Sequence, residues 1–145
     1  MAPRDNRGMT QAQLMRARVI WGAMVMGQVL FAVIAVAIKG NIKPPMAADL
    51  VMTLHVLDAV LFAAGAGIGY MVWRTLARRG QDGSVDGGKY LTGLIIFMAG
   101  CEGPSLFGIV LVMLSGTLHP GIVVPAVAVL AQLIAFPRGR NALAE

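Results

Sequence analysis

The chain has 145 residues, of which 57% are hydrophobic and only 13% are charged, and its mean hydropathy is +0.73. Soluble domains carry roughly 25% charged residues, so the composition excludes an ordinary soluble domain and indicates an integral membrane protein built as one bundle. The net charge of +5 does not indicate nucleic-acid binding, because the basic residues flank apolar runs and are not clustered with aromatic ones.

Four apolar runs are long enough to cross the ~30 Å core of a bilayer as helices. They cover residues 19–38, 50–73, 90–116 and 118–136. The last run is the weakest, because Pro120 and Pro125 lie near its start. We therefore predict an all-α polytopic membrane protein with four transmembrane helices in a bundle.

The N-terminal segment is expected to be a disordered tail over residues 1–9. Thr10 and Gln13 then form a capping-box pattern, which predicts that the first helix begins before the membrane. A cleaved signal peptide is the alternative for this span, because the residues at 35–37 resemble a small-residue cleavage site. Its 20-residue apolar run is longer than a usual signal-peptide core, which favours a permanent span.

The second run combines a polar pair with a stripe of small residues. His55 and Asp58 are three residues apart and can interact directly on one helix face, which they share with Gly65 and Gly69. Glycines at this spacing let helices approach closely in lipid. The polar pair is interpreted either as a buried structural pair or as a proton relay.

The third run, residues 90–116, has 27 residues and a single charge, Glu102, near mid-membrane. Its own helical face is apolar, whereas Gly100 and Gly103 lie on the opposite side, which we expect to pack against the second helix. An ionised carboxylate costs several kcal/mol at that depth, on the order of 3 on insertion scales. We therefore expect Glu102 to be protonated and to be a candidate for proton or ion binding. The alternative is a structural acid that Gln28, Gln132 or a partner chain hydrogen-bonds.

Basic residues are distributed unequally between the two sides of the predicted bundle. Two of them, Lys39 and Lys43, follow the first span. The N-terminal tail, the flexible loop predicted at residues 79–88 with its flanks, and the C-terminal tail hold the other ten: Arg4, Arg7, Arg16, Arg18, Arg74, Arg78, Arg79, Lys89, Arg138 and Arg140. By the positive-inside rule, both termini are expected to be cytoplasmic. We expect a multi-pass protein of the plasma (inner) membrane of a bacterium.

The hairpin over residues 65–116 resembles the two-helix proteolipid (c) subunit of rotary ATP synthases. The resemblance rests on the glycine-rich stretch 65–69, the polar loop with Arg79, Gln81 and Asp82, and the stretch from Glu102 to Val110 with its aromatic-Gly-aliphatic segment. It implies that Glu102 is a proton- or sodium-binding carboxylate and that the loop is cytoplasmic. The first and fourth spans have no counterpart in that hairpin.

Three functions stay open at this point. The first is a proton- or ion-handling membrane subunit that uses Glu102. The second is a non-catalytic accessory or assembly subunit in which Glu102, Asp58 and His55 are structural. The third, a small multidrug-type transporter, ranks last because its key Glu lies in the first span, where this chain has no acid.

No enzyme, metal site or cofactor is expected. The chain has no catalytic arrangement of Ser, His and Asp or of Cys and His, and no metal-ligand spacing. Cys101 is the single cysteine, so an intrachain disulfide is excluded. The expected partners are the lipid bilayer and other membrane subunits or further copies of the chain, and not nucleic acid.

Overall fold

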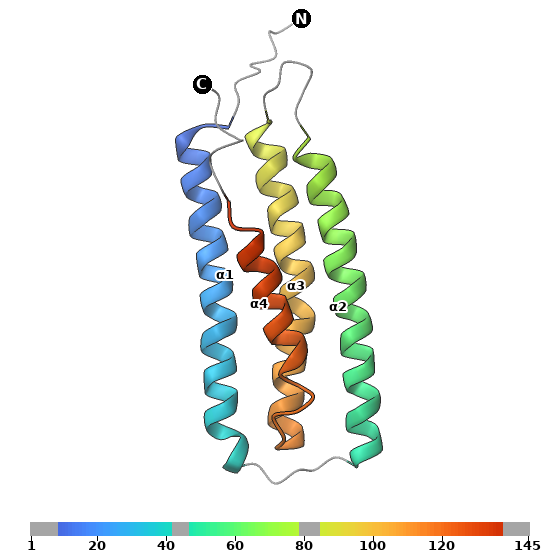
Figure 1. The fold of residues 1–145 in the computed structure, drawn as a ribbon. Coiled ribbons are helices and arrows are strands. Elements are labelled where there is room, and N and C mark those ends of the chain that lie inside the picture. Colours follow the sequence, from blue (N-terminus) through green and yellow to red (C-terminus); the bar gives the residue numbers. More distant parts are fainter. Residues whose placement is uncertain (1–8, 42–46, 79–84, 138–145) are drawn as a thin grey trace, which may run out of the picture.

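The computed structural model describes residues 9–41, 47–78 and 85–137. This part of the chain forms four α-helices and one short 3-10 helix. They are α1 (Gln11–Ile38), η1 (Lys39–Asn41), α2 (Ala48–Leu76), α3 (Gly87–Ser115) and α4 (Val123–Ile134). The helices run alternately up and down the bundle (Figure 1). The predicted all-α fold is therefore confirmed.

Three of the helices are long and apolar enough to span a membrane. These are α1, α2 and α3, with 28, 29 and 29 residues. The predicted fourth span over 118–136 contains only the 12 residues of α4, about 18 Å of helix at ~1.5 Å per residue. A turn occupies residues 119–122 before it. Pro137 follows α4, and a proline disfavours helical geometry at the residue before it.

Local capping sets the start of two helices. Thr10 accepts a hydrogen bond from the Gln13 backbone, and the Gln13 side chain accepts one from the Thr10 backbone at 2.9 Å, so the predicted capping box is confirmed. Asp86 caps α3 by accepting hydrogen bonds from Gly88 N and Lys89 N at 2.9 and 3.1 Å.

The predicted tail and loop fall mostly outside the described residues. Of the predicted tail at 1–9, only Met9 is described, and it is buried. Of the predicted loop at 79–88, residues 79–84 lie outside the description. Asp86 and Gly87 belong to the cap and first turn of α3, because the Asp86 carboxylate satisfies the first free N–H groups of that helix.

Because successive helices run in opposite directions, most of the described basic residues lie at the same end of the bundle. The first turns of α1, the last turn of α2 and the first turn of α3 lie at one end (Figure 1). They carry Arg16, Arg18, Arg74 and Lys89, and Arg78 follows α2 directly. Lys39 follows α1 at the opposite end (Figure 1). We call the first end the basic end and the second the far end.

The chain after α3 returns to the basic end. Trp21 donates a hydrogen bond from Nε1 to Gln132 O at 2.7 Å, and Arg18 donates one from Nε to Pro137 O at 3.3 Å. The rings of Trp21 and Phe136 meet edge to face at 4.8 Å between centroids. These contacts tie the last described residues to the first turns of α1.

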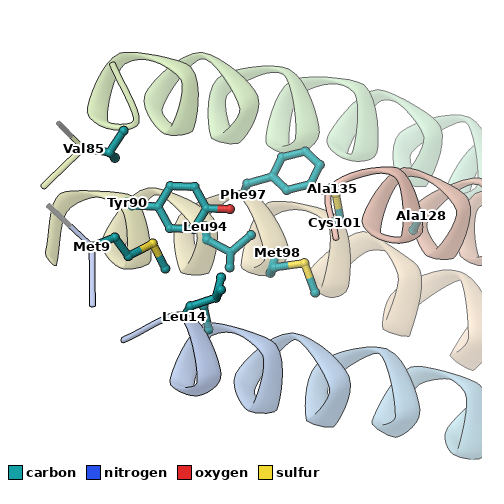
Figure 2. Close-up of a cluster of buried hydrophobic side chains, with 11 residues drawn as sticks. Met9, Leu14, Val85, Tyr90, Leu94, Phe97, Met98, Cys101, Ala128 and Ala135 are labelled. Atoms are coloured by element: carbon teal, nitrogen blue, oxygen red, sulfur yellow. The ribbon is translucent and has the colours of Figure 1, made fainter. Parts of the chain in front are cut away.

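Helix α3 lies at the centre of the packing. Its first half carries five of the eleven residues in a cluster of buried apolar side chains, to which α1 and α4 also contribute (Figure 2). The cluster comprises Met9, Leu14, Ala17, Val85, Tyr90, Leu94, Phe97, Met98, Cys101, Ala128 and Ala135. This apolar cluster therefore lies toward the basic end of the bundle.

Candidate functional site

Glu102 lies on α3, at the border between its buried and exposed faces. Its side chain is partly exposed, next to the exposed residues Ala99 and Gly103. Within the described ranges, no hydrogen bond or ion pair joins its carboxylate to another residue. The arrangement therefore leaves the acid at the surface of the bundle.

Neither of the two glutamines expected as possible partners of Glu102 is hydrogen-bonded to it. Gln132 is fully buried and donates from Nε2 to Met98 O at 3.5 Å. Gln28 is 1% exposed, and neither atom of its amide group has a hydrogen-bond partner among the described residues. Neither glutamine therefore satisfies the carboxylate of Glu102 in this chain.

Glycines bring the backbones of α2 and α3 into direct contact. Gly65 lies against Gly100, so closely that a Cβ on either residue would collide with the carbonyl oxygen of the other. Gly69 faces Phe97, whose Cα would lie 2.8 Å from an added Cβ. Pro104 has no N–H to donate to the Gly100 carbonyl, and the Gly65 backbone of α2 lies against that carbonyl.

Gly103 does not belong to this contact, since nothing lies within 4 Å of the position that its Cβ would take. It is exposed on α3. Gly100 and Gly103 are three residues apart, which leaves them offset by about 60° around the helix, and this offset turns Gly103 out of the contact that Gly100 makes. Of the four glycines proposed for packing, the structure therefore brings Gly65, Gly69 and Gly100 together and leaves Gly103 outside.

The polar pair on α2 is buried but is not hydrogen-bonded to itself. Asp58 is 1% exposed and His55 8%. Both carboxylate oxygens of Asp58 and Nε2 of His55 lack a hydrogen-bond partner in the described part of the chain. The expected direct interaction between them is absent, and both side chains face residues of α3 and of the turn before α4.

Two glycines make the room that these polar side chains occupy. A Cβ on Gly108 of α3 would lie 2.7 Å from Asp58 Oδ2 and 3.0 Å from Pro125 Cδ. A Cβ on Gly121, in the turn before α4, would lie 2.9 Å from His55 Cε1. Any larger residue at either position would press on the polar groups. The site is therefore assembled from α2, α3 and the segment leading into α4.

Further unpartnered polar atoms lie on the same side of α3. Ser105 is fully buried, one turn from Gly108, and its hydroxyl has no partner among the described residues. Met98, Cys101, Ser105, Gly108, Val112 and Ser115 are all buried, with the alternating three- and four-residue spacing of one helical face. We call this row the α3 seam.

Sequence reasoning did not single out Ser105 or Gly121 and used Gly108 only within the resemblance. A serine in an apolar run was a visible signal for Ser105. The pairing of Gly108 and Gly121 with Asp58 and His55 had no signal in the sequence, because it depends on how three segments meet.

Two hollows lie beside the α3 seam, each lined by one of its serines. A groove of about 590 Å³ lies between α1, α3 and α4, with Gln28, Val33, Ser105, Ile109, Pro125 and Leu130 among its lining residues. A second hollow of about 320 Å³ lies at the far end, lined by Ala48, Val51, Met52, His55, Ser115, Thr117 and Pro120. We call the second hollow the vestibule.

A metal centre has no support in the described ranges, where no three His, Cys, Asp or Glu side chains group together. Cys101 is a free, fully buried thiol in the apolar cluster. Comparison of the chain with protein-family models, curated proteins and solved structures found no match. The candidate functional features of the described chain are therefore Glu102, the His55 and Asp58 site, and the hollows beside them.

Proposed function

We propose that this protein is a small integral membrane subunit that handles protons or another small cation through Glu102. The observation that carries the proposal is the placement of a carboxylate in an apolar span, at the surface of the bundle, without a partner in the described chain. A carboxylate in lipid is stable when it holds a proton or an ion, and it gives that charge up where a polar surface meets it. The resemblance to proteolipid subunits supports the same role for Glu102.

The proposal includes four membrane crossings with both termini in the cytoplasm, in the inner membrane of a bacterium. Ten of the twelve basic residues support this orientation, since they lie before α1 or in its first turns, between the last turn of α2 and the first turn of α3, or after α4. The short helix α4 would cross together with the residues on either side of it. Labelling of single cysteines on a Cys101→Ser background tests this, with Ser84→Cys expected to react only from the cytoplasmic side and Thr117→Cys only from the other.

Labelling by a hydrophobic carbodiimide tests the role of Glu102, because such reagents attack protonated carboxyls in membranes. In native membranes, mass spectrometry is expected to find the adduct on Glu102, with slower labelling at high pH. Glu102→Gln should fold normally and lose the adduct, whereas the control Asp49→Asn, at the exposed start of α2, should keep it. A folded wild-type protein without an adduct on Glu102 would refute the proposal.

An accessory or assembly subunit is the second candidate. It is favoured by the large apolar surface that α1 and α2 expose, with only 11% of the most apolar stretch of each buried inside the bundle. Lipid or other subunits would cover that surface. Stoichiometry in mild detergent separates the two functions. A ring of many copies supports ion handling, and a single copy in a complex of different chains supports the accessory role.

A further inference from the structure

The vestibule leads from the far end of the bundle to His55. Its outer lining includes Ala48, Met52 and Thr117, which are exposed, whereas His55 and Ser115 are each only 8% exposed. Its volume of about 320 Å³ far exceeds the ~10–15 Å³ that one water molecule requires. The Ser115 hydroxyl lies 3.1 Å from the Thr117 hydroxyl, so the vestibule has polar groups near its mouth as well as at His55.

Asp58 lies one helical turn deeper than His55 and is connected to it through Gly121. Gly121 packs against the His55 ring. The Gly121 carbonyl oxygen and Asp58 Oδ2 both approach Gly108, at 3.1 and 2.7 Å from the position of an added Cβ. The carboxylate of Asp58 is therefore buried one helical turn behind His55, and the Gly121 carbonyl oxygen approaches the same glycine.

That carbonyl lacks the donor that an ordinary helix would supply. The residue four positions after Gly121 is Pro125, which has no N–H. No other hydrogen bond within the described chain ends on Gly121 O. A carboxylic acid can donate through its O–H, whereas a carboxylate can only accept. A proton on Asp58 would thus give the side chain a donor, in a region where the Gly121 carbonyl oxygen accepts no hydrogen bond within the described chain.

No opposite charge faces Asp58 from the described elements packed against it. On α2 the neighbouring titratable group is His55. The α3 residues at this level are Gly108 and other uncharged members of the α3 seam, and α4 contributes Pro125. In the turn, His119 is exposed. A buried carboxylate without a counter-charge is costly, so a proton is the simplest partner that the arrangement offers.

We infer that Asp58 is a second proton-binding site, separate from Glu102, which exchanges its proton with water at the far end through the vestibule and past His55. The proton adds to a carboxylate oxygen of Asp58 from a hydronium ion in the vestibule, leaving water, and returns by the same route. Gly108 and Gly121 allow Asp58 and His55 to occupy these positions, because a Cβ on either glycine would collide with them. The inference holds whether or not Glu102 carries a proton.

Infrared spectroscopy of the full chain in lipid nanodiscs tests this. Glu102→Gln serves as the background, so that residue 102 contributes no carboxylic-acid signal. A failure of proton binding at Asp58 is then distinguished from a failure of proton binding at Glu102. A carboxylic-acid C=O band is expected in Glu102→Gln and should disappear in the double variant with Asp58→Asn. After transfer to D₂O the band should shift as the acid proton exchanges. A band that is insensitive to Asp58→Asn, or no band at all, would overturn the inference.

The route is tested by narrowing the vestibule. Val51→Phe should slow the D₂O shift severalfold, whereas the matched control Val56→Phe should not, because Val56 is 58% exposed on the outer side of α2. If Val51→Phe fails to fold, Ala48→Trp at the exposed mouth replaces it. Equal exchange rates in the folded vestibule variant and the Val56→Phe control would show that protons reach Asp58 by another path.

Discussion

The two ends of the bundle are built differently. At the basic end, buried side chains are mostly apolar and the Trp21 and Arg18 side chains donate hydrogen bonds to the last described residues. Trp73 stacks on Phe97 at 5.5 Å between ring centroids, although its indole N–H has no partner among the described residues. At the far end, the groove and the vestibule open beside buried polar groups without partners.

This difference follows from the length of α4. The short helix packs against α1 near the basic end and begins only at Val123, after a turn. Close packing in membranes comes from shape complementarity and hydrogen bonds rather than from exclusion of water. The basic end therefore supplies the rigid contacts, and the far end supplies room for the groups to which we assign function.

The largest expected effect is a cavity in the apolar cluster. Leu94 is fully buried there, and Leu→Ala changes in cores cost about 2–5 kcal/mol. We expect Leu94→Ala to lower the free energy of unfolding by about 2 kcal/mol, at the lower end of that range, because lipid rather than water receives the unfolded side chain. The control is Leu130→Ala, because Leu130 lines the groove and is 59% exposed. This variant should leave the free energy of unfolding in detergent nearly unchanged.

The glycine contact between α2 and α3 gives the next effect. Gly100→Ala places a methyl group against the Gly65 backbone, and over-packing of this kind costs about 1–3 kcal/mol. Gly103→Ala adds the same methyl group where nothing lies within 4 Å. Thermal unfolding in detergent should therefore show a lower midpoint for Gly100→Ala alone. Equal midpoints for the two variants would mean that the helices are not held at this distance.

A smaller effect is expected from the tie between α4 and α1. Trp21→Phe keeps an aromatic ring but removes the donor to Gln132 O, and a typical hydrogen bond contributes about 0.5–1.5 kcal/mol. Hydrogen exchange should show the last turn of α4 opening more readily in this variant, with α2 unchanged as the internal reference. A uniform increase in hydrogen-exchange rates across all helices would show that the Trp21 hydrogen bond does not act locally.

The smallest effect is expected at the far end. Ser105→Ala removes a buried hydroxyl without a partner in the described chain, so no protein hydrogen bond is lost. The free energy of unfolding should stay within about 0.5 kcal/mol of the wild type or rise slightly. A clear loss of stability in chemical unfolding would show that the hydroxyl has a partner, and it would reduce the contrast between the two ends.

The sequence by itself determined the helical elements. Three long apolar runs predicted α1, α2 and α3, and Thr10 with Gln13 predicted the cap of α1. The spacing of Gly65 and Gly69 predicted a close helix contact, which the structure places against α3. Prolines flagged the fourth run as weak, and its helix is indeed short. These features are local, since they depend on run length, capping and backbone chemistry.

Which side chains face inward was decided only by the tertiary structure. Met98 and Ile109 lie on the apolar face that Glu102 shares and are buried, whereas Ile95 on that face is 39% exposed. In a soluble helix, polarity separates these faces, but lipid and protein core are equally apolar, so hydrophobic pattern carries no such information in a membrane. The meeting of Asp58 with Gly108 and Gly121 depends on the packing of three segments, and it therefore exists only in the folded chain.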